Sequence, residues 1–395
     1  CHFAGNSERQ AALRSWAEKH PAAQDYARFR AVVERQRAGW PAWPARMRNG
    51  ILQEQDYDPE AERYHLYVQW LAFQQFREAA DRARQSGQGL YLDLPLGVHP
   101  DGYDVWRERA AFAPEASVGA PPDAFFAQGQ DWGFPPLHPE RIRDQGYRYY
   151  LACLRHHLRH ASVLRLDHVM GLHRLFWVPR SLSAREGVYV RYRAEEFYAI
   201  LTLESQRSRT LLVGEDLGTV PGCVRAAMTR HKVYRMYVLP FEYKPDPYQA
   251  LRPIPAGVLA CLNTHDMPPF KAFWLEKEKN INDRLALPLF LRRRGRLQIP
   301  TNNVEAVFLA CLKHLAASRA RLLAVNLEDL WLETAPQNVP GTGDEYPNWR
   351  RKARYALETF TQKPEVRAAL SEINRLRGGA SRAAFEHLPK RGRKL

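Results

Sequence analysis

The sequence predicts an α/β fold built on parallel strands and preceded by a long helical stretch. From residue 7 to about residue 88, apolar and aromatic residues such as Trp16, Phe29 and Trp70 recur at the spacing of helix faces. Further on, short β-type runs appear, each followed by a polar end and a helical stretch, and this alternation is typical of βα units. The runs are Leu90–Leu96, Val163–Val169, Leu211–Asp216, Arg235–Phe241, Val258–Asp266 and Leu322–Asp329.

The ends of these runs indicate the kind of sheet. Four of them end in an acidic residue or an acid-histidine pair, in the segments LDLP, RLDH, GEDLG and NTHD. A single acid there is often a turn residue or a helix cap, but four in the same place favour the active site of a (β/α)₈ barrel, whose functional groups stand at the carboxyl ends of the strands. We therefore predict a TIM-type barrel with helical insertions. A closed barrel needs about eight strands, so we expect this one to lack its first two.

Composition narrows the function classes. Lys and Arg outnumber Asp and Glu by 58 to 43, a net charge of +15, but the arginines are scattered and no basic stripe alternates with aromatics. We therefore expect no specific nucleic-acid partner. No apolar run reaches membrane-spanning length, so no membrane is expected as a partner. Five separated cysteines without a CxxC pair fit neither a disulfide framework nor a zinc site, and free thiols predict a cytoplasmic protein.

The sequence lacks the motifs of several other classes of enzyme and binding site. His156, His157 and His160 invite a zinc hypothesis, but no HExxH accompanies them and arginines lie between them, so a solvated basic face is the better interpretation and no metal site is predicted. The sequence contains no GxSxG, no P-loop and no GxGxxG opening a helix.

Three acids are the candidates for chemistry: Asp167, Glu215 and Asp266. Cleaving a glycosidic bond with retention needs two carboxyl groups about 5 Å apart, one as nucleophile and one as general acid and base. Arg165 precedes Asp167 by two residues, so both side chains point to one face of a strand, where a guanidinium favours the ionised carboxylate. A purely structural Arg–Asp pair explains that spacing equally well.

Several motifs together resemble one known family. LDLP and DVW lie within residues 92–106, GAPPD and GQDWGFP within 119–135, and RLDH at 165–168. GEDLG follows at 214–218, NTHD at 263–266, and NVPGT with a later NW within 338–349. In this order they resemble the amylomaltase family of 4-α-glucanotransferases, which includes the plant disproportionating enzymes. The chain departs from the family pattern at Gln337, where an arginine is usual, and at Val169 and Met170.

The resemblance implies roles for individual residues. Asp167 falls on the nucleophile, Glu215 on the general acid and base, and Asp266 on the third acid, which favours the distorted sugar ring. The residues that fall on substrate-binding positions are Arg165, His265, Trp132, Asp216, Phe241, Asn338 and Asp101. The implied activity is transfer of α-1,4-glucan segments between maltooligosaccharides, or between starch- or glycogen-derived glucans, through a glycosyl-enzyme and without a metal or organic cofactor.

The domain prediction follows from the same comparison. Residues 1–88 are expected to be a helical segment of the barrel's insertion subdomain, 89–380 the catalytic barrel portion, and 381–395 a basic C-terminal tail. Because the family's first strands have no counterpart here and the chain begins at Cys1, we hypothesise an N-terminally truncated enzyme. Two alternatives stay open at this point: a glucan hydrolase of the α-amylase clan, and an inactive truncated fragment.

Overall fold

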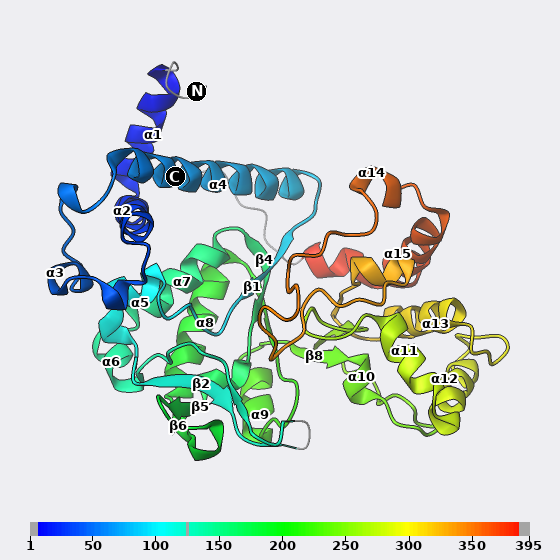
Figure 1. Ribbon diagram of the computed structural model, residues 1–395. Coiled ribbons are helices and arrows are strands. Elements are labelled where there is room, and N and C mark those ends of the chain that lie inside the picture. Colours follow the sequence, from blue (N-terminus) through cyan, green and yellow to red (C-terminus); the bar gives the residue numbers. More distant parts are fainter. Residues whose placement is uncertain (1–6, 124–125, 387–395) are drawn as a thin grey trace. The chain divides into compact units, whose positions relative to one another are not determined.

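The computed structural model describes residues 7–123 and 126–386, which form two compact units, Cys1–Thr210 and Leu211–Leu395 (Figure 1). Each unit combines helices with β-strands, so the predicted α/β class is confirmed. Within the described residues, no helix is both long and apolar enough to cross a lipid bilayer.

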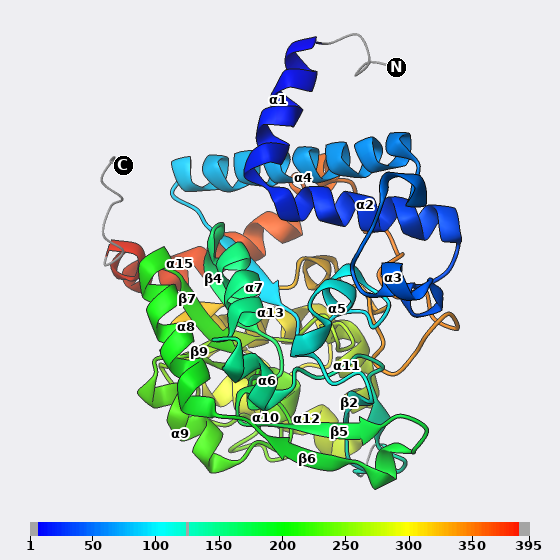
Figure 2. The same ribbon diagram turned by 90° about the vertical axis from the view of Figure 1, so that its left-hand side faces the viewer.

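The first unit opens with the predicted helices. They are α1 (Ser7–Lys19), α2 (Pro21–Gln36), α3 (Ala45–Arg48) and α4 (Pro59–Gln85). Helix α4 begins at Pro59 because proline suits the first helical position and the Asp58 side chain accepts a hydrogen bond from the Glu60 amide at 2.9 Å. Helices α2 and α4 pack along each other, with α1 above them (Figure 2). The described part of this stretch contains no strand, as predicted.

Two sheets complete the first unit. Strands β1 (Leu90–Leu94) and β4 (Ala161–Leu166) are parallel, with Asp93 opposite Arg165. The second sheet is antiparallel, in the order β3-β2-β5-β6 (Figure 1). Its strands are β2 (Ala116–Ala120), β3 (Gln130–Asp131), β5 (Arg174–Pro179) and β6 (Val188–Arg191), and the helices of this part are α5 (Tyr103–Arg107), α6 (Pro139–Asp144), α7 (Arg148–Leu158) and α8 (Ala194–Ser208).

The sequence did not predict the antiparallel sheet, because its strands lack a clear alternation of polar and apolar residues. One glycine shows how tightly it is built. A Cβ on Gly119 would lie 2.0 Å from the carbonyl oxygen of Gln130, so only glycine permits the close approach of β2 and β3.

The second unit is built on parallel strands that follow one another in chain order. They are β7 (Leu211–Gly214), β8 (Arg235–Val238), β9 (Val258–Cys261) and β10 (Leu322–Leu323). Strands β8, β9 and β10 are hydrogen bonded in that order, and a parallel bridge from Val213 to Tyr234 joins β7 to β8. All six predicted β-type runs are therefore strands. They end earlier than predicted: after β7 and β9 the acidic residues lie in loops, whereas the run after β8 continues as the helix Leu239–Glu242 and the run after β10 ends in the 3₁₀ helix Leu327–Trp331.

Helices follow these strands along the chain of the second unit. They are α9 (Gly222–Arg230), α10 (Leu239–Glu242), α11 (Phe270–Glu278), α12 (Ile281–Arg293), α13 (Val304–Ala316), α14 (Leu357–Phe360) and α15 (Pro364–Glu386). Helix α13 packs against α11, α12 and α15 around a core that includes Trp274, Phe290 and Leu312. Helix α15 continues to Glu386, so the first residues of the predicted basic tail are helical, while 387–395 lie outside the described residues.

Candidate active site

In the first unit, the candidate residues gather around a buried arginine at the carboxyl end of β4. Arg165 is 5% exposed, and its Nη1 atom lies 2.8 Å from Asp167 Oδ1. The same nitrogen donates to both carboxylate oxygens of Asp93, at 2.9 and 2.8 Å. The predicted placement of Arg165 and Asp167 on one face is confirmed. Because Asp93 stands opposite Arg165 in the register of β1 and β4, it becomes a second carboxylate on one guanidinium.

The backbone fixes Asp167 as well. Its amide donates to the carbonyl of Leu94 at 3.1 Å, which extends the pairing of β1 and β4 by one residue. The next residue, His168, has a left-handed backbone (φ 43°), and this turns the chain away from the sheet directly after Asp167. About a third of the Asp167 side chain is exposed. Its carboxylate is therefore accessible to solvent while the ion pair with Arg165 fixes its position.

Trp132 contacts the residue that follows Asp167, which is His168. The two rings meet edge to face, with centroids 5.3 Å apart, and Phe134 lies 6.3 Å from the Trp132 ring in a stacked arrangement. Asp101 stands on a separate loop, where its carboxylate lies against Gly39; a Cβ on Gly39 would come within 2.9 Å of Asp101 Oδ2. The structure thus places Trp132, but not Asp101, in a contact that leads to the Asp167 cluster.

In the second unit, Glu215 follows β7 directly. One of its carboxylate oxygens accepts a hydrogen bond from the Leu217 amide at 2.7 Å. The turn then continues through Gly218, whose φ of +78° favours glycine. This local bond orients the Glu215 carboxyl group at the carboxyl edge of the parallel strands.

Asp216 points the other way. Its side chain is completely buried and accepts hydrogen bonds from Arg235 Nε at 2.8 Å, Arg225 Nε at 3.1 Å and the Met236 amide at 2.9 Å. These partners anchor the end of β7 to the start of β8 and to α9. In this structure Asp216 stabilises the chain segment that carries its neighbour Glu215. The predicted contact of Asp216 with substrate stays a prediction.

Asp266 lies in the loop after β9, between two other candidate residues. Asn338 Nδ2 donates to Asp266 Oδ1 at 2.7 Å, and His265 Nε2 lies 3.1 Å from Asp266 Oδ2. The Trp349 ring is 5.6 Å from the His265 ring. The fold therefore brings together Asp266 and Asn338, which are 72 positions apart in sequence.

The buried side chains of Asn263 and Asp329 stabilise the start of this loop. Asn263 donates to Asp329 Oδ2 at 2.9 Å and accepts from Asn326 at 3.2 Å, while Asp329 Oδ1 accepts from the Phe270 amide at 2.7 Å. Burial raises the pKa of Asp329 to about 7, although the bonds from Phe270 and Asn263 oppose that shift. Asn263 is therefore a structural member of the NTHD motif.

The remaining candidates are more loosely placed. Phe241 stands on α10, directly after β8, and is 50% exposed, so its ring is accessible for stacking.

Throughout the described ranges, no three His, Cys, Asp or Glu side chains gather as metal ligands would. The histidine group of the sequence is divided: His160 is buried against Phe76, which corrects the expectation of a wholly solvated face. The described cysteines, at 153, 223, 261 and 311, are free thiols.

Sequence reasoning missed two members of the site. Asp93 was visible in the LDLP segment, but only the strand register shows that it shares Arg165 with Asp167. Trp349 was visible in the NW pair, but only the folded loop brings it to His265. Nothing in their local sequence distinguishes them from structural residues.

Carboxylates at the carboxyl ends of parallel strands, flanked by accessible aromatic rings, are the arrangement typical of enzymes that act on glycosidic bonds. The model of the 4-alpha-glucanotransferase protein family matches residues 2–358 of this chain. The chain therefore belongs to the 4-alpha-glucanotransferase family.

Individual relatives agree with this assignment. The 4-alpha-glucanotransferase of Mycobacterium tuberculosis strain H37Rv is 35% identical over 379 residues, covering 88% of this chain and 52% of the relative. That of Haemophilus influenzae is 30% identical, covering 87% and 54%. The chain spans about half the length of these curated relatives.

Solved structures agree as well. The amylomaltase of Corynebacterium glutamicum is similar with a TM-score of 0.78 and 28% identity, over 93% of this chain and 56% of that one. The amylomaltase of Streptococcus agalactiae in complex with acarbose has a TM-score of 0.81 at 19% identity, over 94% and 75%, which is a likeness of fold alone.

Proposed function

We propose that this chain is a 4-α-glucanotransferase of the amylomaltase type, which transfers α-1,4-glucan segments between maltooligosaccharides or starch- or glycogen-derived glucans. The observation that carries the proposal is the family match over residues 2–358, because it includes every candidate site residue. The solved relative that holds acarbose, a saccharide analogue, supports a glucan as substrate.

The proposed reaction has two displacements. Asp167 attacks the anomeric carbon as the glycosidic C–O bond breaks, and Glu215 gives its proton to the leaving oxygen. An acceptor sugar hydroxyl then gives its proton to Glu215 while its oxygen displaces Asp167 from the anomeric carbon. The ion pair of Asp167 with the buried Arg165 supports the first role, because it fixes the direction of the carboxylate.

Asp266 is proposed to stabilise the distorted sugar ring of the transition state. Its bond from Asn338 and its contact with His265 support this role, since they hold the carboxylate while 38% of the Asp266 side chain stays exposed. Trp132 and Phe241 are proposed to stack on donor sugars, and Asp101 is retained from the resemblance as a further donor-site residue. The buried Asp216, which the resemblance also assigns to the donor site, is proposed to act there through the position of Glu215.

The architecture proposed for this function is a (β/α)₈-type barrel with residues 1–88 as an inserted helical segment and 89–380 as the barrel portion. The parallel pairs β1-β4 and β7 to β10 support it. The free thiols support a reducing compartment, and we propose the cytoplasm.

The test is incubation of the purified chain with maltotriose, followed by chromatography of the products and an assay of reducing ends. Transfer predicts glucose together with a ladder of longer maltooligosaccharides, at a constant number of reducing ends. Glu215→Gln should abolish the ladder. Glu305→Gln, the same change at an exposed position of α13, should leave it intact.

The other outcomes reject the proposal in different ways. A rise in reducing ends without longer products identifies a hydrolase. A folded chain that converts nothing is an inactive member of the family. A ladder that persists in Glu215→Gln means that another group donates the proton.

A further inference from the structure

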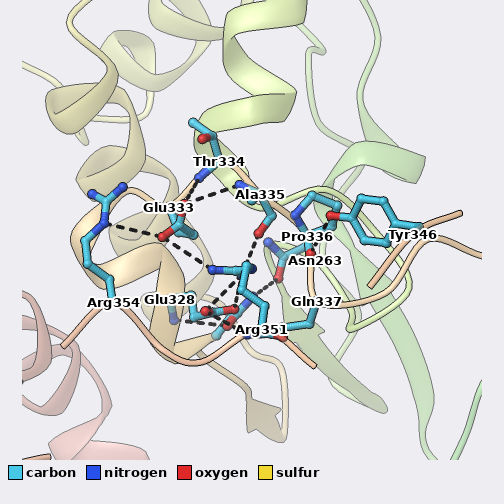
Figure 3. A network of polar contacts seen from close by, with 11 residues as sticks. Asn263, Glu328, Glu333, Thr334, Ala335, Pro336, Gln337, Tyr346, Arg351 and Arg354 are labelled. Carbon is cyan, nitrogen blue, oxygen red and sulfur yellow. Dashed lines mark hydrogen bonds and ion pairs between the residues drawn. The ribbon is translucent and has the colours of Figure 1, made fainter. Parts of the chain in front are cut away.

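A polar network lies behind the residues that hold Asp266, and it is centred on Arg351 (Figure 3). The network ties together the two limbs of one loop. We call residues 333–350 the Asn338 segment, because it carries Asn338 on its first limb and Trp349 on its second. Both of these residues reach the candidate site, one at Asp266 and one at His265.

Arg351 joins three parts of the network. Its Nη2 atom donates to the carbonyl of Ala335 at 2.6 Å, on the first limb. The same nitrogen lies 3.1 and 3.2 Å from the two carboxylate oxygens of Glu328, and Nη1 is 3.6 Å from Glu333. The Glu328 and Glu333 side chains are only 11% and 6% exposed, so Arg351 compensates two largely buried charges.

Glu328 holds the first limb from the other side. It stands in the short 3₁₀ helix Leu327–Trp331 and accepts a hydrogen bond from Gln337 Nε2 at 3.0 Å. Gln337 is the residue directly before Asn338, and its carbonyl accepts from the Trp349 amide at 2.9 Å. One carboxylate thus holds both Gln337 and Arg351, and through them both limbs of the segment.

Further hydrogen bonds lie within the segment itself, among them those from Asn348 Nδ2 to Thr342. Asn348 Oδ1 accepts from the Val339 amide at 2.9 Å. Tyr346 donates to the carbonyl of Pro336 at 2.9 Å (Figure 3). These bonds join one limb to the other within the segment. The Arg351–Glu328 pair, by contrast, attaches the limbs to the helix after β10.

We infer that Arg351 is a positioning residue for the transfer reaction: by clamping the Asn338 segment onto Glu328, it holds Asn338 on Asp266 and Trp349 on His265. The inference rests on the proposed function for its effect on rate, but not for its effect on the order of the segment. Because the bond to Asp266 is expected to matter most in the transition state, loss of the clamp should lower kcat more than it changes KM.

The chain provides a matched control in Arg354. It also pairs with Glu333, at 3.5 Å, but its side chain is 52% exposed, and this ion pair involves neither Glu328 nor Ala335 (Figure 3). Removing Arg354 deletes a positive charge beside the same glutamate and leaves the clamp in place. An effect on the segment that comes from net charge alone should therefore appear equally in both variants.

The experiment compares Arg351→Ala, Arg351→Lys and Arg354→Ala in the full chain by two measurements. Hydrogen exchange, read by mass spectrometry on peptides that span 336–350, reports the order of the segment. Steady-state transfer from maltotriose reports kcat and KM. The Lys variant keeps the charge but not the fork of donors, so it still reports if Arg351→Ala fails to fold.

We expect exchange within the segment to accelerate about tenfold in Arg351→Ala, and kcat to fall roughly ten- to a hundredfold, as for loss of a charge-assisted hydrogen bond. Arg351→Lys should lie between this variant and the wild type, and millimolar guanidinium should partly restore Arg351→Ala. Arg354→Ala should keep wild-type exchange and stay within about fivefold in rate.

Three results have distinct meanings. If exchange in the segment is the same in Arg351→Ala as in Arg354→Ala, the inference is wrong. If exchange rises throughout the second unit and the melting temperature falls with it, Arg351 only stabilises the fold, and the inference is also wrong. If the wild type transfers nothing, the proposed function fails, while accelerated exchange confined to the segment still supports the clamp.

Discussion

Substitution of Asp216 separates two roles that the same residue has been given. The resemblance implies contact with donor sugars, whereas the structure buries the side chain completely between Arg225, Arg235 and the Met236 amide. We predict that Asp216→Ala lowers the stability of the fold and leaves the apparent affinity for substrate nearly unchanged.

The expected loss can be worked from the contacts. Removing one partner of a buried ion pair costs about 3–5 kcal/mol. Here the two arginine side chains are 40% and 30% exposed and regain water, so we place the loss for Asp216→Ala at about 2–3 kcal/mol, just below that range. Asp216→Asn keeps an acceptor and should lose about 1–2 kcal/mol.

Urea denaturation followed by tryptophan fluorescence measures the loss, with Asp344→Asn as a control because that side chain is fully exposed. Maltotriose kinetics on the same samples should give a KM within about twofold of wild type. An Asp216→Ala variant that is as stable as the wild type but has a KM raised tenfold or more would refute this reasoning and restore the substrate-binding role.

Three further predictions test other contacts. Asp93→Asn weakens one of the two carboxylate partners of Arg165 and should lower the transfer rate roughly ten- to a hundredfold, measured with maltotriose. Asn338→Ala deletes the 2.7 Å bond to Asp266 and should lower kcat by a similar factor at little change in KM. For Asp329, burial raises the folded pKa to about 7 from 3.8, so the folded state binds more protons than the unfolded state between these values. Stability should therefore fall as pH rises through this window, and urea unfolding from about pH 5 to about pH 8 should show this fall in the wild type but not in Asp329→Asn.

Each of these has an outcome that contradicts it. Asp144→Asn, an exposed acid at the end of α6, is the control for Asp93, and equal rates in the two variants would mean that Asp93 does not support Asp167. A raised KM with unchanged kcat in Asn338→Ala would make its bond to Asp266 a ground-state contact. For Asp329, a parallel pH dependence in wild type and variant would show that another group titrates.

The sequence by itself determined the α/β class, the helical start and the location of all six parallel strands, because hydrophobic periodicity and strand-end acids are local patterns. It also determined the family, since specific motifs such as GAPPD and GQDWGFP survive in order along the chain. The spacing of Arg165 and Asp167 was enough to place both on one face of a strand.

Only the tertiary structure decided which side chains meet across the sequence. The antiparallel sheet consists of strands without a clear alternation of polar and apolar residues, and it depends on a backbone approach that only Gly119 permits. That Asp93 shares Arg165 follows from strand register, and the burial of Asp216 follows from two arginines on other elements. Strand register and burial arise from contacts between residues that are far apart in the sequence. The local sequence around either residue does not show which distant residue it will contact.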